Sequence, residues 1–337
     1  LGQKVQNKLL GVVPAVWKKR MQSPLFAGSG PKMGYTNLYE SLRLHRGSVF
    51  APREVTPGMP CVLYFPGCGG SLFYDRIGLA AIMLLLHTGH AVAVPPRHLC
   101  CGYPLLAAGM DTEYEDNMAQ NRQYLASMLR NLAKQGFDVR YLATACGSCR
   151  DSLARMKLNE QFPQLEQKDV SQIVLPLLQH ESMEAPVAPG TSVLYHAACH
   201  CEWAGVPTLK GQSQLTGALE QLCKVKVTTI PGCCGESGMG AVTSPTIYNL
   251  LRARKKERLA RAFEPQPQTG ACYAGPILVG CPSCKIGIAR CLIQLKEKHP
   301  VLHVLEWLAN QVDGEDRRQR FRRRANETRG DVRIIQC

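Results

Sequence analysis

Short apolar runs alternate along the chain with longer segments in which apolar residues recur every three or four positions. Short runs bounded by Gly, Pro or polar residues are typical of buried strands. They occur at residues 61–65, 90–94, 139–143, 192–196, 225–230 and 277–279. Segments with helical spacing lie between or after them, at 77–87, 111–136, 214–222, 244–263 and 281–295. Strands that alternate with helices predict an α/β fold with open, mostly parallel sheets.

The order of these elements is repeated, and so are the cysteines that follow the strands. Each copy contains a lone Cys, then Cys-Cys-Gly, then Cys-x-x-Cys. The lone Cys precedes the adjacent pair by 32 positions in the first copy and 34 in the second, and the next gaps are 45 and 47. Matched spacing of this kind predicts an internal duplication. The ten cysteines are Cys68, Cys100, Cys101, Cys146 and Cys149, then Cys199, Cys233, Cys234, Cys281 and Cys284.

The duplication predicts two domains and two flanking segments. We expect a first domain over 56–187 and a second over 188–312. Residues 1–55 mix basic and apolar residues with several prolines, which indicates an arm or linker. Residues 313–337 are rich in arginine and predict a basic tail that is solvated or bound to a partner. Docking of this tail on an acidic subunit or an anionic membrane surface is the alternative.

The composition places the chain among soluble globular proteins. Its 337 residues can bury two cores, and contents of 45% hydrophobic and 20% charged residues are ordinary for that class. The longest apolar run, 79–86, is far too short to cross a bilayer, and no secretory signal is visible. We therefore expect a cytoplasmic protein, with peripheral membrane association through partners as the open alternative.

Five cysteines in each copy exceed the four ligands that a structural zinc ion uses. The side chains of two adjacent cysteines tend to diverge, so they suit two metal centres of a polynuclear core better than one small ion. Disulfides fit poorly, because the chain is long and its cysteines are grouped. Iron–sulfur clusters, whose usual ligands are thiolates, are therefore the leading prediction. Glycines beside the cysteines leave room for backbone N–H groups to approach sulfur, as expected for Gly69, Gly102, Gly147 and Gly235.

The formal net charge of +14 counts every cysteine as neutral. Five thiolates around an inorganic core of about +2 would add roughly three negative charges per cluster. Two clusters would therefore bring the loaded protein much closer to neutrality. Since no recognition motif is present either, we expect no nucleic-acid partner.

The repeated motif, over about residues 60–310, resembles the cysteine-rich CCG domain of heterodisulfide reductase. The same domain occurs in iron–sulfur subunits of glycolate oxidase, lactate-utilisation and anaerobic glycerol-3-phosphate dehydrogenase systems. Residues 100–104, 232–236 and 280–284 carry the resemblance. It implies two tandem Rossmann-like domains, each holding a noncubane 4Fe-4S cluster on its five cysteines.

Two functions follow from this resemblance. The first is an iron–sulfur oxidoreductase component, similar to heterodisulfide reductase, that exchanges electrons with a flavin-bearing partner. The alternative is an electron relay in a flavin-linked dehydrogenase for a 2-hydroxy acid such as lactate or glycolate. The chain contains neither ferredoxin-type cysteine runs nor G-x-G-x-x-G, so FAD and ferredoxin-type clusters would belong to partner subunits or to an upstream region. A zinc-binding scaffold without redox function is the alternative from another class.

Three further side chains are candidates for proton transfer near the cysteines. His196 and His200 flank Cys199, and Glu236 directly follows the second Cys-Cys-Gly. Histidine exchanges protons near neutral pH, which gives it a catalytic interpretation beside that of a buried structural residue. For Glu236 the structural alternative is a carboxylate at a helix start.

Overall fold

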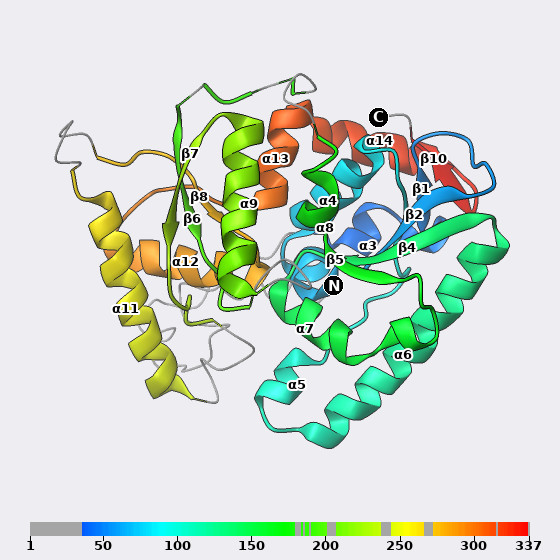
Figure 1. Cartoon of the computed structure of the whole chain (residues 1–337), viewed down its shortest axis with the longest axis horizontal. Helices are drawn as coiled ribbons and strands as arrows, with labels where there is room; N and C mark the ends of the chain where they lie inside the picture. The colour runs from blue at the N-terminus through cyan, green and yellow to red at the C-terminus, as the bar shows by residue number, and fades with distance from the viewer. Residues whose placement is uncertain are drawn as a thin grey trace.

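Two β-sheets lie side by side, with helices packed between them and on their outer faces (Figure 1). The computed structural model describes residues 36–178, 183–184, 186–188, 190–200, 207–236, 244–265, 272–314 and 316–335. Residues 1–35 of the expected N-terminal arm therefore lie outside the described part. Within that part, no helix combines the length and the apolar character needed to cross a membrane.

The first sheet has six strands in the order β10-β1-β3-β2-β4-β5. Strands β3, β2, β4 and β5 are parallel neighbours, whereas β1 is antiparallel to β3 and parallel to β10. Their bounds are β1 (Val49–Ala51), β2 (Met59–Tyr64), β3 (Ala91–Ala93), β4 (Phe137–Thr144), β5 (Glu166–Asp169) and β10 (Val332–Ile334).

The helices of the first unit cover both faces of this sheet. Helix α4 (Asp75–His87) is buried from Ile77 to Leu86, which explains its almost unbroken apolar sequence. Helix α6 (Asp111–Lys134) is amphipathic and buries one face. The remaining helical segments are α3 (Leu38–Ser41), η1 (Leu44–Arg46), η2 (Gly69–Phe73), α5 (Tyr103–Ala107), α7 (Gly147–Arg155), η3 (Leu158–Glu160) and α8 (Val170–Val174).

The second sheet has four parallel strands in the order β7-β6-β8-β9. This order repeats β3-β2-β4-β5, so the duplication read from the sequence is also a duplication of topology. The α/β class with mostly parallel sheets is confirmed. The elements are β6 (Ser192–His196), α9 (Thr208–Cys223), β7 (Lys226–Ile230), α11 (Pro245–Phe263), β8 (Ile277–Val279), α12 (Pro282–Leu295), β9 (Val301–His303) and α13 (Val304–Asp313).

The two units share one hydrophobic cluster. Helix α13 packs against α4 and α8 as well as against β8 and β9, and these helices lie between the sheets in Figure 1. The cluster contains Val62 of the first sheet, Val193 of the second and Leu305 of α13. Burial of apolar surface by both units in one cluster fixes their relative position, because displacement would expose it.

The flanking segments differ from the expected arm and tail. Residues 49–51 form β1 inside the first sheet, and β10 extends that sheet beyond β1. Helix α14 (Arg317–Glu327) packs against α4 and buries Phe321 and Ala325. Arginine-rich composition suggested a solvated tail, but apolar residues four apart give α14 one buried face. The domain boundaries stay a prediction. Both flanking segments contribute a strand to the first sheet.

Equivalent helices of the two units start at buried side-chain caps. Asp169 accepts a hydrogen bond from the backbone N–H of Ser171 at 2.8 Å at the start of α8. His303 caps α13 in the same way, through the N–H of Leu305 at 3.2 Å. Both caps are almost fully buried. Burial raises the pKa of the Asp169 carboxyl to about 7, against the hydrogen bonds from Ser171.

Asp169 is expected to make stability depend on pH. Its carboxyl binds a proton more tightly in the folded protein than its ordinary pKa of 3.8 implies, so the folded state holds more protons between about pH 4 and 7. Stability should therefore fall as pH rises through that window, by about 1.4 kcal/mol per unit at most. Asp169→Asn keeps the capping oxygen and should remove this slope. Urea unfolding of both proteins at pH 5 and 8 measures it; parallel pH dependence would contradict the assignment.

Candidate metal centre

Every cysteine group of the repeat follows the carboxyl end of a parallel strand. Cys68 follows β2, Cys100 follows β3, and Cys146 follows β4; the second copy repeats this after β6, β7 and β8. Parallel strands end at the same edge of a sheet, so the three groups of each copy come together there. The sequence-predicted meeting of the cysteines at one edge is what the structure shows for each unit.

The Cys-x-x-Cys pairs open helices in both copies. Cys146 is the N-cap of α7 and Cys281 the N-cap of α12, both with extended backbone (φ −157° and −145°). Cys149 and Cys284 therefore lie in the first helical turn, where backbone N–H groups have no carbonyl partner within the helix and the helix dipole is positive. That environment favours thiolates.

The two five-cysteine groups face each other. The Sγ atoms of Cys146 and Cys281 are only 3.6 Å apart, although the residues are 135 positions apart in the chain. Within the copies, thiol contacts join Cys68 to Cys100, Cys101 to Cys149, Cys199 to Cys233 and Cys234 to Cys284. No disulfide is formed by any cysteine of the described part.

The first member of the adjacent pair has a lowered thiol pKa in both copies. The hydrogen bond with Cys68 lowers the pKa of Cys100 to about 6, against burial and with help from the Gly102 N–H. The corresponding bond with Cys199 lowers the pKa of Cys233. In each copy a neighbouring thiol thus favours the thiolate form of the first member of the adjacent pair.

The glycine of Cys-Cys-Gly has a conformational reason in both copies. Gly102 has φ +77° and points its N–H at Cys100 Sγ, 3.4 Å away; Gly235 has φ +70° and reaches Cys233 Sγ at 3.3 Å. Positive φ is costly for residues with a Cβ atom. The expected N–H approach to sulfur is thus present at these two glycines.

Gly102→Ala should lower stability more than Gly89→Ala, because the two glycines have similar φ angles but only Gly102 is surrounded by side chains. A Cβ at Gly102 would lie 2.8 Å from Asn117 Nδ2 and 2.9 Å from Tyr114 Cδ2, whereas Gly89, with φ +85°, has nothing within 4 Å. Gly89→Ala should cost about 1 kcal/mol through strain alone. Gly102→Ala should cost about 2–4 kcal/mol, since overpacking adds to strain. Denaturant unfolding measures the stability of both variants. Equal losses of stability would mean that Asn117 and Tyr114 move aside at no cost.

Gly69 and Gly147 lie against the other copy rather than against sulfur. A Cβ on Gly69 would collide with the ring of Pro282, and one on Gly147 would lie 2.8 Å from the carbonyl oxygen of His200. These glycines therefore permit the close approach of the two copies. A glycine that sequence reasoning passed over, Gly67, does border sulfur: its Cβ would lie 2.6 Å from Cys149 Sγ.

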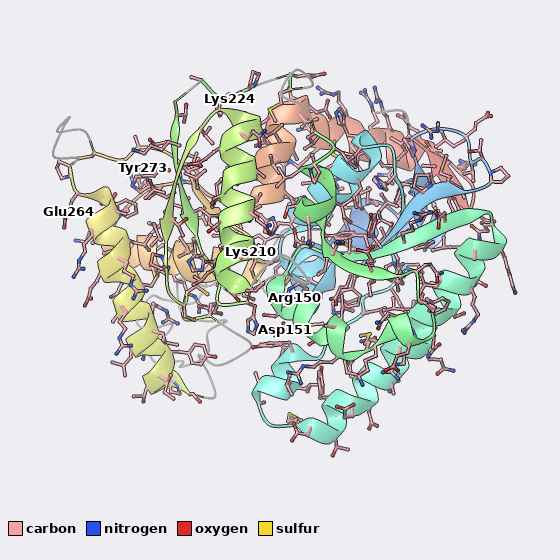
Figure 2. All side chains as sticks on the ribbon, in the orientation of Figure 1. Arg150, Asp151, Lys210, Lys224, Glu264 and Tyr273 are labelled. Carbon is pink, nitrogen blue, oxygen red and sulfur yellow. The ribbon has the colours of Figure 1, made fainter. Side chains whose placement is uncertain are left out.

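His200 joins the two copies through both ring nitrogens. Its Nδ1 lies 2.9 Å from an Asp151 carboxylate oxygen, and its Nε2 lies 2.8 Å from the Tyr103 hydroxyl. Both partners belong to the first copy, and Figure 2 shows Asp151 on α7 at the junction with the second unit. Since each nitrogen has a protein partner, the geometry supports anchoring; a catalytic role stays a prediction.

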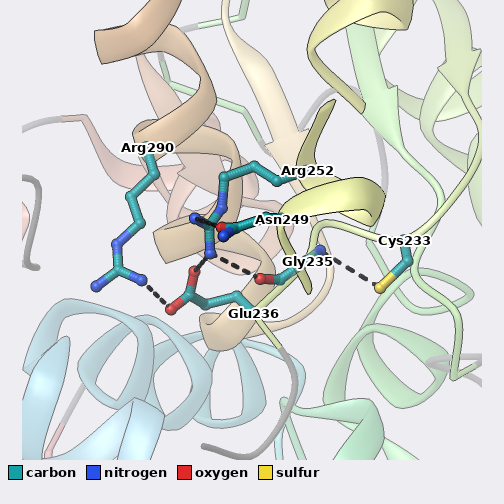
Figure 3. Close-up of polar contacts among 6 residues, drawn as sticks. All are labelled: Cys233, Gly235, Glu236, Asn249, Arg252 and Arg290. Carbon is teal, nitrogen blue, oxygen red and sulfur yellow. Dashed lines mark hydrogen bonds and ion pairs between the residues drawn. The ribbon is translucent and has the colours of Figure 1, made fainter. Parts of the chain in front are cut away.

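Glu236 is held by two arginines. Its carboxylate pairs with Arg290 and lies 3.6 Å from Arg252, and burial raises its pKa against these two cations. Arg252 also donates to the carbonyl of Gly235 at 3.2 Å, as Figure 3 shows. The network fixes the backbone beside Cys233. This geometry fits a structural carboxylate better than a proton carrier.

His196 is completely buried at the end of β6 and lies beside the second cysteine group. One of its ring nitrogens, Cys234 Sγ and Cys284 Sγ all lie within 4.8 Å of one another. The other contact is with Lys255, whose Nζ is 2.8 Å from Nδ1. Burial, and then the charge of Lys255, lower the pKa of His196 to about 3, so its ring is neutral.

Two neighbours of the cysteines were missed by sequence reasoning. His98 Nε2 lies 3.4 Å from Cys68 Sγ; its place two residues before the adjacent pair was the only available signal. Lys255 is in the middle of a basic helix and gave no signal of burial. Of the unmatched cysteines, Cys61, Cys223 and Cys291 are buried and Cys272 is exposed, while Cys201 and Cys337 lie outside the described residues.

The donor set fits an iron–sulfur group better than a single ion. Each copy brings five thiols to one sheet edge, with adjacent cysteines, the first turn of a helix and a Gly N–H directed at sulfur. A tetrahedral zinc ion would leave one thiol of each five unused. Thiolates with N–H donors around them are the usual surroundings of iron–sulfur clusters.

Several known proteins are similar to this chain in sequence or in structure. The chain is 24% identical over 270 residues to lactate utilization protein A of Exiguobacterium sp., an alignment that covers 74% of this chain and 97% of that protein. It is 26% identical over 212 residues to the protein of the same name from Geobacillus thermodenitrificans, covering 59% and 81%. Glutamate racemase RacE1 of Bacillus anthracis aligns over 82% of this chain and 97% of its own, with 13% identity and a TM-score of 0.28, which is too low to support any conclusion.

A family model for the cysteine-rich domain known as CCG matches residues 62–154 and again residues 193–289. These two ranges contain all ten of the repeated cysteines and most of the chain between the flanking segments. The chain therefore belongs to the CCG cysteine-rich domain family, with two copies of the domain in tandem.

Proposed function

We propose that this chain is an iron–sulfur electron-transfer component of a flavin-linked system that oxidises a 2-hydroxy acid such as lactate. The observation that carries the proposal is the convergence of ten thiols into two facing groups, with Cys146 and Cys281 in contact. Clusters bound there would carry single electrons. Flavin and substrate sites would belong to partner subunits, and a cytoplasmic location remains part of the proposal.

The assignment of ligands follows the repeat. Cys68, Cys100, Cys101, Cys146 and Cys149 would hold one cluster, and Cys199, Cys233, Cys234, Cys281 and Cys284 the other. The number and the noncubane 4Fe-4S type of these clusters are proposals that rest on the resemblance described above.

The burial of the thiols supports electron transfer between the two sites. The Cys-x-x-Cys cysteines of both copies are buried where the copies meet, while Cys68, Cys100, Cys199 and Cys233 are partly or largely exposed. Each site therefore has a dry inner side toward the other site and an outer side that a partner subunit can approach. An inner contact of 3.6 Å between thiols leaves no room for water between them.

The relatives favour the dehydrogenase system over the interpretation as a heterodisulfide reductase component. Two relatives with 97% and 81% of their length covered are both called lactate utilization protein A. The main interpretation from the sequence, a component similar to heterodisulfide reductase, is supported less well than its alternative. A 2-hydroxy-acid system accordingly becomes the proposed setting.

Anaerobic purification of the full chain, followed by iron and acid-labile sulfide analysis and electron paramagnetic resonance, tests the proposal. Two 4Fe-4S clusters should give about eight iron and eight sulfide atoms per chain. Zinc in place of iron and sulfide would overturn electron transfer in favour of a scaffold. Reduction of a disulfide substrate by the isolated chain, with reduced viologen as electron donor, would restore the reductase interpretation. If the isolated chain reduces no disulfide but its clusters are reduced by a flavin partner supplied with lactate, the result supports the electron relay.

A further inference from the structure

The two copies differ at one equivalent position in the wall of the site. Residues 62–64 and 193–195 align at an offset of 131, which places His196 where the first copy has Phe65. Phe65 is fully buried beside its own cysteines: its Cε1 atom and Cys149 Sγ lie 3.8 and 2.6 Å from the place of a Cβ on Gly67. An apolar ring in one copy thus corresponds to a polar ring in the other.

The hydrogen bonds of Lys255 determine which nitrogen of His196 carries hydrogen. Lys255 is 1% exposed, and its Nζ lies 2.8 Å from His196 Nδ1, 3.1 Å from the Ile230 carbonyl oxygen and 2.8 Å from the Pro231 carbonyl oxygen. An ammonium group has three hydrogens and no lone pair, so it donates all three bonds. Nδ1 is therefore an acceptor, and the hydrogen of the neutral ring is on Nε2.

This Nε2–H group is buried and has no hydrogen-bond partner among the described residues. Leaving a buried donor unpaired costs about 1–3 kcal/mol, so a group that accepts from it is expected. The sulfur atoms of Cys234 and Cys284 lie within 4.8 Å of a ring nitrogen of His196, which puts these two sulfur groups close to the ring. A nitrogen that carries hydrogen is not a metal ligand, which leaves donation to sulfur as its chemistry.

We propose that His196, oriented by Lys255, donates its Nε2–H to a thiolate or sulfide of the second cluster and raises the reduction potential of that cluster above that of the first. This rests on the proposed function. Hydrogen bonds to cluster sulfur stabilise the more negative, reduced state. The apolar Phe65 supplies no such bond. Electrons would therefore pass from the first copy to the second, across the contact between Cys146 and Cys281.

His98 does not give the first site an equal donor. Ser71 donates its hydroxyl hydrogen to the carbonyl of Gly67, so the contact of 3.5 Å between Ser71 Oγ and His98 Nδ1 needs the hydrogen of the imidazole on Nδ1. Nε2, the nitrogen facing Cys68 Sγ at 3.4 Å, is then an acceptor. An acceptor does not stabilise added negative charge on the cluster.

Redox titration of the full, cluster-loaded chain, followed by electron paramagnetic resonance, tests the proposal. Two separate reduction steps are expected, the second cluster being reduced first; Cys101→Ser and Cys234→Ser assign them. His196→Phe introduces the residue of the first copy and should shift only the second cluster to lower potential. His196→Gln keeps an N–H donor and should restore part of the shift, whereas Lys255→Met should reproduce part of the loss by freeing the tautomer.

Phe65→His is the matched control from the other copy, and it should leave the second cluster unchanged. An unchanged potential of the second cluster in His196→Phe at full iron content would overturn the proposal, and so would equal shifts of both clusters. If His196→Phe loses iron, the potentials of the second cluster in His196→Gln and Lys255→Met test the proposal instead. Potentials unchanged from the wild type in both variants would overturn it. Absence of iron and sulfide from the wild-type chain would instead refute the proposed function itself.

Discussion

Cys234→Ser is expected to abolish the spectroscopic signal of the second cluster and to lower the iron content by about half. Cys234 is 2% exposed and contacts both Cys233 and Cys284, so a serine there replaces a central, buried thiolate by a poor ligand. Cys101→Ser should do the same to the first cluster. Iron and sulfide analysis with electron paramagnetic resonance measures both effects.

Two controls make this result specific. Cys223→Ser changes a buried cysteine that only the hydrophobic cluster surrounds, so it should retain all iron. Cys281→Ser should disturb both signals, because Cys281 contacts Cys146 of the other copy. Simultaneous loss of both clusters in Cys101→Ser or Cys234→Ser would contradict two separate sites.

Arg333→Met is expected to lower the free energy of unfolding by about 3–5 kcal/mol. Arg333 is 1% exposed in β10, and its guanidinium donates to the carbonyls of Leu42 at 2.6 Å, Ala325 at 2.9 Å, Arg43 at 2.6 Å and Gly47. Methionine would leave these carbonyl groups, which residues 42–47 and helix α14 contribute, without that donor. Denaturant unfolding of the full chain measures the loss.

Arg323→Met provides the comparison for Arg333→Met. Arg323 lies on the exposed side of α14, in the same basic segment, so its replacement should change stability by less than about 0.5 kcal/mol. Similar small losses in both variants would show that the buried guanidinium is not what holds the C-terminal segment to the first sheet.

The parallel core of both units could be predicted because pattern and spacing repeat. Apolar runs predicted strands β2, β3, β4, β6, β7 and β8, whereas the charged strand β5 (Glu166–Asp169) had no such signal. The rule that ligands gather at the carboxyl ends of strands grouped the cysteines of each copy. The facing of the two groups could not be predicted. It depends on how α13 packs against α4 and on the room left by Gly69 and Gly147, and neither contact has a local signal in the sequence.

The strands of the flanking segments could not be predicted for a different reason. Strands β1 and β10 are three residues long each, and β10 has an arginine at its buried position. A charged residue normally marks an exposed position, and only backbone carbonyls from other segments make its burial favourable. The burial of Lys255 could not be predicted for the same reason, since its hydrogen-bond partners are carbonyls at the end of β7 and a histidine 59 positions away.

The position of β10 has a consequence for biosynthesis. This strand pairs with β1, yet the whole second copy separates the two in the chain. During translation, the second copy would therefore leave the ribosome before β10 could pair with β1 in the first sheet. Nascent chains would carry an unfinished, pairing-competent strand for much of translation, a state prone to aggregation. The first sheet is thus expected to gain its last strand only after the second copy has been synthesised.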